Sequence, residues 1–213
     1  MAQPTSGAPQ GTPGSPGGAG TRGKAPSRHD VHSTSEQGAG WSTKRIAVTA
    51  LFCAVAAICT LVVEFPILPG VTWLKYDPSG IVALIAGFAF GPATGAVVSI
   101  IPYLVHLATQ SGIYGMLMAM LATLSLVMPA SLIYRRDTTM RGAAIGLAVG
   151  GAVSICACIV GNIIVTPLYT GMGVDAVIAL IVPALLPFNA IKVVANCALT
   201  MLVYKPIAKA LDN

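Results

Sequence analysis

The sequence predicts an all-α integral membrane protein, a bundle of six transmembrane helices with both termini in the cytoplasm. Hydrophobic residues make up 55% of the 213-residue chain and charged residues only 9%, whereas a soluble domain carries roughly 25% charged residues. Most basic residues flank long apolar runs and form no stripe with aromatic residues, so the net charge of +5 does not indicate nucleic-acid binding. We therefore expect a multi-pass protein of the cell (plasma) membrane.

Residues 1–43 differ in composition from the rest of the chain. Gly, Pro, Ser, Thr and Ala dominate this segment and show no apolar periodicity, which is typical of disorder. It lacks the apolar stretch of a cleavable signal peptide. We expect a disordered cytoplasmic tail, followed by one membrane domain over residues 44–213.

Six apolar segments follow the tail. The predicted spans cover residues 46–63, two short segments within 79–109, and then residues 113–134, 142–168 and 174–204. A span needs about 20 apolar residues to cross a hydrocarbon core roughly 30 Å thick. The turn signal Gly91-Pro92 separates the second span from the third, and Pro suits the first position of a helix. Pro183 and Pro187 lie near the start of the sixth span.

The basic residues indicate the orientation of the bundle. Lys44 and Arg45 precede the first span, three arginines lie between the fourth and fifth, and two lysines follow the sixth. With six spans these residues share one side, and only Lys75 falls in an opposite loop. The positive-inside rule then places both termini in the cytoplasm and the segment 64–78 outside.

Lys192 is the only basic residue between Arg141 and Lys205. A cation at membrane depth costs ~2.5 kcal/mol on insertion scales, so it persists mainly where it faces a cavity or a partner. Asn189 lies three residues earlier and shares a helical face with Lys192. Pro187 lacks an N–H group and opens the helix beside that face. These residues predict a polar site within the sixth span.

Asn162 on the fifth span is expected at a similar depth, in the outer half of the membrane. Two carboxamides and an ammonium would then line one outward-opening pocket. A carboxamide both donates and accepts hydrogen bonds, which suits a heterocycle with alternating N–H and C=O groups. The alternative is that Asn162 and Asn189 only hold helices together, a contact worth ~0.6 kcal/mol on average.

Three segments resemble a known family. Residues 186–192, Leu-Pro-Phe-Asn-Ala-Ile-Lys, resemble the Leu-Pro-Phe-Asn-x-x-Lys signature of the vitamin-binding S components of energy-coupling factor (ECF) transporters. Asn162 with residues 167–169 is similar to the Asn-x₄-Pro-Leu-Tyr stretch of the riboflavin-specific members. Residues 74–80 resemble the family's Leu-Lys-Ile-Asp-Phe-Ser-Asp segment, with departures at Pro78 and Gly80. The resemblance covers residues 44 to 209.

The resemblance implies a substrate-capture subunit, not an enzyme, that binds riboflavin from outside. Asn162, Asn189 and Lys192 would bond the polar edge of the isoalloxazine. The candidate substrate-binding residues are Asn162, Asn189, Lys192, Lys75, Tyr76 and Tyr169. Trp73 and Tyr76 suit either stacking on an aromatic ring or anchoring at the membrane interface. We expect no metal and no resident cofactor, since riboflavin would be the transported ligand.

The resemblance also implies partners. The chain has no Gly-x₄-Gly-Lys-Ser/Thr segment that could cradle ATP, so uphill uptake would require a transmembrane coupling subunit and two ATPase subunits. In the family an alanine patch on the first helix docks on the coupling subunit, and Ala50 and Ala54 form such a pair here. A pair of small residues is also common in ordinary helix packing.

The sequence leaves two alternatives to riboflavin capture. Within the family, the chain could bind another vitamin or a flavin nucleotide. Outside it, the chain could be a small membrane enzyme, or a structural helix bundle whose polar residues only hold helices together.

The predicted orientation has a direct test. Cysteine introduced at Thr72 should react with an impermeant maleimide in intact cells, whereas cysteine at Thr138 should react only after lysis, because the positive-inside rule places these loops on opposite sides. The opposite labelling pattern would reject the orientation and the outward-facing pocket with it.

Overall fold

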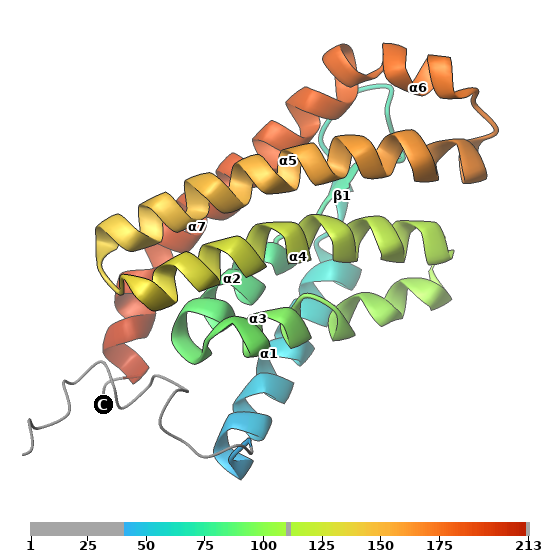
Figure 1. The fold of residues 1–213 in the computed structure, drawn as a ribbon. Helices are drawn as coiled ribbons and strands as arrows, with labels where there is room; N and C mark the ends of the chain where they lie inside the picture. The colour runs from blue at the N-terminus through green and yellow to red at the C-terminus, as the bar shows by residue number, and fades with distance from the viewer. Residues whose placement is uncertain (1–40, 110–111, 212–213) are drawn as a thin grey trace, which may run out of the picture.

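The computed structural model describes residues 41–109 and 112–211, with side chains up to Tyr204, and almost all of them are helical (Figure 1). The elements are α1 (Thr43–Val62), β1 (Phe65–Pro66), β2 (Lys75–Tyr76), α2 (Ser79–Phe90), α3 (Pro92–Val98), the 3-10 helix η1 (Ile101–Ala108), α4 (Gly112–Arg136), α5 (Met140–Thr170), α6 (Val174–Ala179), the π-helical turn η2 (Ile181–Leu185) and α7 (Leu186–Leu211). The predicted disordered tail lies outside the described residues up to residue 40. Helix α1 begins one residue before the predicted domain start, because the side chain of Ser42 caps it by accepting the N–H of Arg45.

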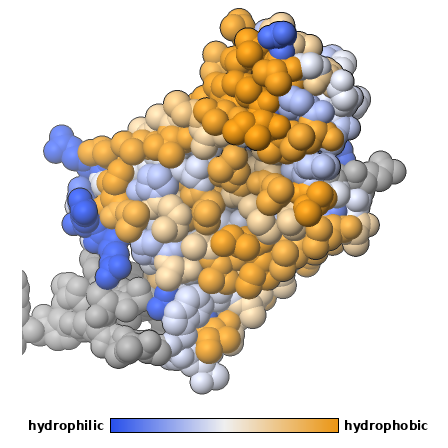
Figure 2. Space-filling view, turned by 45° about the vertical axis from the view of Figure 1, so that its right-hand side comes forward, coloured by the Kyte–Doolittle hydropathy of each residue, from blue (hydrophilic) through white to orange (hydrophobic). Residues whose placement is uncertain are grey.

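Four stretches of the described chain are long and apolar enough to cross a membrane. They are residues 43–62, 112–136, 140–170 and 181–204. Large hydrophobic side chains remain exposed along all of them, and Figure 2 shows a mostly hydrophobic face with hydrophilic residues gathered toward one end. Exposed apolar area on this scale indicates a surface that is covered by lipid. The protein is therefore an all-helical integral membrane protein.

The second and third predicted spans are short. Helix α2 has 12 residues and would be about 18 Å long at 1.5 Å per residue, less than the hydrocarbon thickness. Gly91, with φ 88°, separates it from α3, which Pro92 begins. Helix α3 and η1 together form the next apolar segment. Eight of the twelve α2 residues are buried, so neighbouring helices enclose this short element.

The region predicted to hold the sixth span, residues 174–204, is divided into three helical elements. The short helix α6 ends at Ala179, a π-helical turn follows, and α7 begins at Leu186. Pro187 lies in the first turn of α7, where its missing N–H leaves no helical bond unmade. The prediction that residues 174–204 hold the sixth span, with Pro183 and Pro187 near its start, agrees with the apolar helical stretch 181–204, which the short helix α6 precedes.

The loop between α1 and α2 folds onto the bundle. Strands β1 and β2 pair antiparallel, with Phe65 opposite Tyr76 and Pro66 opposite Lys75. Apolar loop residues then pack against a buried cluster that includes Leu74, Leu185 and Phe188. The loop is thus attached to the start of α7, and this attachment forms one wall of the site described below.

Helices α4 and α5 lie side by side along their length (Figure 1). Glycines make this close approach possible. A Cβ atom at Gly146 would lie 2.7 Å from the carbonyl oxygen of Ala130, and one at Gly150 would lie 2.4 Å from that of Leu126. Both distances are shorter than real Cβ contacts, so only glycine allows the backbones this separation.

Gly150→Ala should therefore destabilise the protein, although alanine favours a helix more than glycine does. We expect a loss of about 1–3 kcal/mol, typical of overpacking, measured as a lower thermal midpoint in detergent. Gly173→Ala is the control, because a Cβ there meets nothing within 4 Å and φ is −65°. Equal midpoints for Gly150→Ala and wild type would show that the helices are not held by this contact.

Candidate functional site

One cavity of about 100 Å³ lies between α4, α5, the start of α7 and the loop before α2. Five of the six predicted substrate-binding residues line it. They are Asn162, Asn189, Lys192, Lys75 and Tyr169. The three polar residues of the predicted pocket, which come from two different helices, therefore share one cavity.

Asn189 and Lys192 are placed by the first turns of α7. Their three-residue spacing puts both on the face toward the cavity, and both side chains are buried. The amide nitrogen of Asn189 donates to the carbonyl oxygen of Leu185 at 2.8 Å. This bond uses one of its two N–H groups and holds the carboxamide beside Lys192.

Asn162 approaches the cavity from α5. Its amide nitrogen donates to the carbonyl oxygen of Cys158 at 2.8 Å, and its side-chain oxygen accepts from the hydroxyl of Thr166 at 3.0 Å. These bonds lie within α5, so Asn162 does not join two helices in this structure. They fix the rotamer of a buried carboxamide that still has an unused N–H donor.

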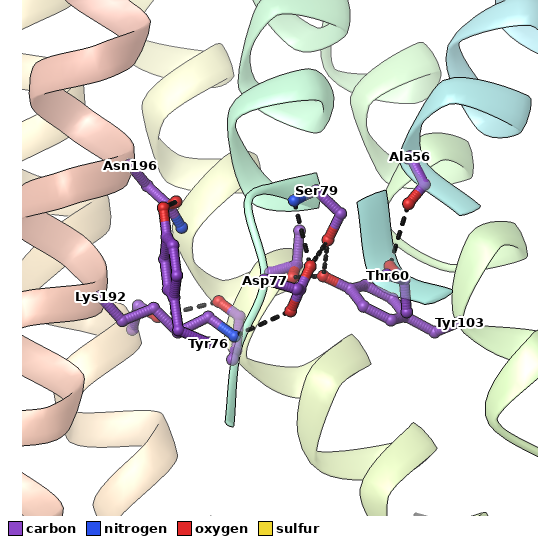
Figure 3. A network of polar contacts seen from close by, with 11 residues as sticks. Ala56, Thr60, Tyr76, Asp77, Ser79, Tyr103, Lys192 and Asn196 are labelled. Atoms are coloured by element: carbon purple, nitrogen blue, oxygen red, sulfur yellow. Dashed lines mark hydrogen bonds and ion pairs between the residues drawn. The ribbon is translucent and has the colours of Figure 1, made fainter. Parts of the chain in front are cut away.

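Lys192 forms a buried ion pair that the sequence analysis missed. Its ammonium nitrogen lies 3.4 Å from Oδ2 of Asp77, and the two side chains are only 11% and 5% exposed (Figure 3). Burial alone would raise the pKa of Asp77, but the Lys192 ammonium and hydrogen bonds from Ser79 outweigh it and hold that pKa below its ordinary value. The carboxylate is thus ionised and neutralises the lysine.

A sequence signal for this pair did exist. A lysine at membrane depth requires a counter-charge, and few carboxylates lie on the predicted outer side: Glu64, Asp77 and Asp175. The sequence therefore limits the partner to three carboxylates, and the structure identifies Asp77 among them.

Aromatic rings lie toward the cavity end formed by the loop, the start of α4 and the end of α5. Tyr114 and Tyr169 are stacked with centroids 5.8 Å apart, and Trp73 meets Tyr169 edge-on at 6.5 Å. All three line the cavity together with Glu64 and Lys75. Lys75 pairs with Glu64 at 3.1 Å, and both side chains are partly exposed. This end is therefore aromatic and partly exposed, whereas the end at Lys192 is polar and buried.

Tyr76 is the exception among the predicted residues, because it is not among those that line the cavity. Burial raises its pKa, and its hydroxyl donates to Oδ1 of Asn196 at 3.1 Å (Figure 3). A Cβ at Gly80 would lie 2.5 Å from the amide nitrogen of Asn196. Gly80, a departure from the family pattern, therefore leaves the space that Asn196 fills.

The two alanines of the predicted docking pair lie on α1, apart from the cavity. Their four-residue spacing puts Ala50 and Ala54 on one helical face, and both are exposed. Large apolar side chains, Leu51 and Ile58, flank them on the exposed surface. The pair is therefore available to another protein or to lipid and is not used in packing within the described chain.

Comparisons with known proteins show the family of the chain. A model of the family described as "ECF transporter, substrate-specific component" matches residues 44–204. The chain is 26% identical over 161 residues to "Riboflavin transporter FmnP" of Bacillus subtilis (strain 168), covering 70% of this chain and 84% of that protein. It is 29% identical over 177 residues to "Riboflavin transporter RibU" of Staphylococcus aureus (strain TCH60), covering 80% and 93%.

The fold agrees as well. A solved structure described as "Structure and mechanism of the S component of a bacterial ECF transporter" superposes with a TM-score of 0.69 at 26% identity, covering 80% of this chain and 98% of that one. The family match spans most of the chain, including the cavity and the docking pair. The chain belongs to the family of substrate-specific components of ECF transporters.

Proposed function

We propose that this protein captures riboflavin from outside the cell and delivers it through an ATP-driven ECF transporter complex. The observation that carries the proposal is the convergence of Lys192, Asn189 and Asn162 on one buried cavity, in a family member whose two relatives above are named riboflavin transporters. As a transporter component of the plasma membrane, it is not a small membrane enzyme.

The cavity suits the polar edge of an isoalloxazine. That edge alternates C=O and N–H groups, so it needs donors and an acceptor held at fixed positions. Lys192 supplies only donors, and the carboxamides of Asn162 and Asn189 supply both kinds. The aromatic rings at the other end, Trp73 and Tyr169 among them, suit the faces of a flat ring system. This division of polar and aromatic surface favours a flavin over an aliphatic vitamin.

Riboflavin entry requires movement of the cavity walls. A volume of about 100 Å³ is below the roughly 300–1,000 Å³ of pockets that enclose drug-sized ligands. The parts best able to move are those with partly exposed contacts, the Glu64–Lys75 pair and Tyr169. They belong to the loop and to the end of α5, which we place on the outer side.

The orientation with six membrane passes and cytoplasmic termini remains part of the proposal. The start of α1, the turn between α4 and α5 and the end of α7 point toward one end of the molecule in Figure 1. Exposed Arg135, Arg136 and Arg141 lie at that turn. Basic residues gathered at one end support a cytoplasmic location of that end. Helix α2 and the segment of α3 with η1 would then be the two short passes.

Energy coupling would come from other chains. We infer a transmembrane coupling subunit and two ATPase subunits, since the sequence contains no phosphate-binding loop. Ala50 and Ala54 would form the docking face because small side chains let a second helix approach closely.

Substitutions in the pocket test ligand capture. Lys192→Ala and Asn189→Ala should each weaken riboflavin binding by about 5–150-fold, because an unpaired buried polar group costs ~1–3 kcal/mol. Lys192→Arg should also bind riboflavin poorly, since the larger planar guanidinium group does not replace a compact ammonium. Quenching of flavin fluorescence by the purified protein measures the affinity.

The matched control for this series is Val194→Ala, a lipid-facing position two residues along the same helix, 65% exposed. It should bind like wild type. Wild-type affinity in all three pocket variants would refute the site, and no flavin binding by the wild type would refute the proposed ligand.

Substitutions on α1 test the docking face. Ala50→Leu with Ala54→Leu should leave riboflavin binding unchanged but abolish both co-purification with the coupling subunit and ATP-dependent uptake, because leucine prevents close helix contact. The control is Ala148→Leu with Ala152→Leu, an exposed pair of the same spacing on α5, which should change neither.

Two results would count against this role. Intact co-purification of the α1 double variant would place the docking face elsewhere. Accumulation of riboflavin by the purified chain alone, in proteoliposomes under an ion gradient, would make it a secondary transporter.

A further inference from the structure

We propose that Asp77 is a positioning residue for ligand recognition: it fixes the ammonium of Lys192 at the cavity wall. This inference rests on the proposed riboflavin capture. It concerns a residue outside the predicted set of substrate-binding residues, and it assigns that residue a role exerted through Lys192 and not by direct contact with the ligand.

The lysine needs such a partner. Its stem has four rotatable carbons, and an ammonium without a counter-charge moves toward water at the membrane interface. Lys192 instead lies buried, with 9% of its surface exposed, and its ammonium is 3.4 Å from Oδ2 of Asp77. An ammonium has three donors, so this bond leaves donors for a ligand beside Asn189.

Asp77 is itself held rigidly. Its Oδ1 accepts the backbone N–H of Ser79 at 3.1 Å and a short hydrogen bond from the Ser79 hydroxyl, which leaves Oδ2 for the lysine. The Ser79 hydroxyl lies 2.6 Å from the hydroxyl of Tyr103, and this in turn lies 2.6 Å from the hydroxyl of Thr123. All four side chains are at most 3% exposed.

This chain of contacts connects three elements to the lysine (Figure 3). Ser79 begins α2, Tyr103 belongs to η1 and Thr123 to α4. The carboxylate is therefore anchored by α2, η1 and α4, and it holds the ammonium that α7 carries. The pair is also electrically neutral, which matches a ligand edge that is polar but uncharged.

A double-mutant cycle separates this role from a purely structural one. Asp77→Asn keeps the size of the side chain and an acceptor for Ser79 but removes the charge that holds the ammonium. It should weaken riboflavin binding at least about tenfold, since hydrogen bonds to charged groups exceed 1.4 kcal/mol. In a Lys192→Ala background the same change should have almost no further effect, because its effect passes through the lysine.

The chain offers a matched control. Asp137 also accepts the N–H of the residue two positions on, Thr139, at 3.2 Å, but it lies at the exposed α4–α5 turn. Asp137→Asn should bind like wild type. For every variant, riboflavin affinity is measured by fluorescence titration and stability by thermal unfolding, both on the full chain in detergent.

Asp77→Asn leaves a buried lysine without a counter-charge, which is strongly destabilising, and the variant could fail to fold. A second variant tests the proposal in that case. Ser79→Ala keeps the ion pair and removes only the hydroxyl that orients the carboxylate. It should weaken binding about threefold or more in the wild-type background and not in Lys192→Ala.

The outcomes are distinct. Wild-type affinity in Asp77→Asn, or an equal loss with and without Lys192, would overturn the proposal. If Asp77→Asn does not fold, an equal loss for Ser79→Ala in both backgrounds would overturn it. If the wild-type chain does not bind riboflavin, the proposed function fails first and this inference falls with it.

Discussion

The buried pair of Lys192 and Asp77 is the interaction on which the arrangement of the site depends. A single charge in a medium of low dielectric constant is unstable, and breaking such a pair by removing one partner is strongly destabilising. The pair joins the start of α7 to the loop residue that precedes α2, 115 positions earlier in the chain. Asn189 lies on the same face of α7 one turn before Lys192, so this connection also sets where that carboxamide meets the cavity wall.

The ion pair lies directly before the short helix α2. The chain contacts Lys192 at Asp77, α2 begins two residues later, and Gly91 ends it after 12 residues. Irregular backbone at membrane depth is tolerated only where protein buries it or where it lines a cavity. Here the loop packs on Leu185 and Phe188 and forms the cavity wall, which satisfies both conditions.

The ligand cavity and the docking pair occupy different parts of the molecule. The cavity lies between α4, α5 and α7, whereas Ala50 and Ala54 are exposed on α1. Helix α2 packs against both α1 and α7, and Asp77 lies just before its start. The two proposed sites therefore lie in separate parts of the described chain, and α2 contacts a helix of each.

The sequence alone determined the class of the protein and the main polar residues of its site. Apolar runs must lie in lipid or in a core, and a lysine within such a run must face a polar cavity, so Lys192 and Asn189 could be identified without a structure. Helical spacing placed these two on one face, and it also placed Ala50 and Ala54 together. Only the tertiary structure decided which carboxylate pairs with the lysine, that Tyr76 turns to Asn196 and not to the cavity, and that a short helix and a π-helical turn precede the last long helix. The first two features depend on contacts between residues more than 100 positions apart, and the third depends on the backbone conformation around two prolines. Local periodicity encodes neither.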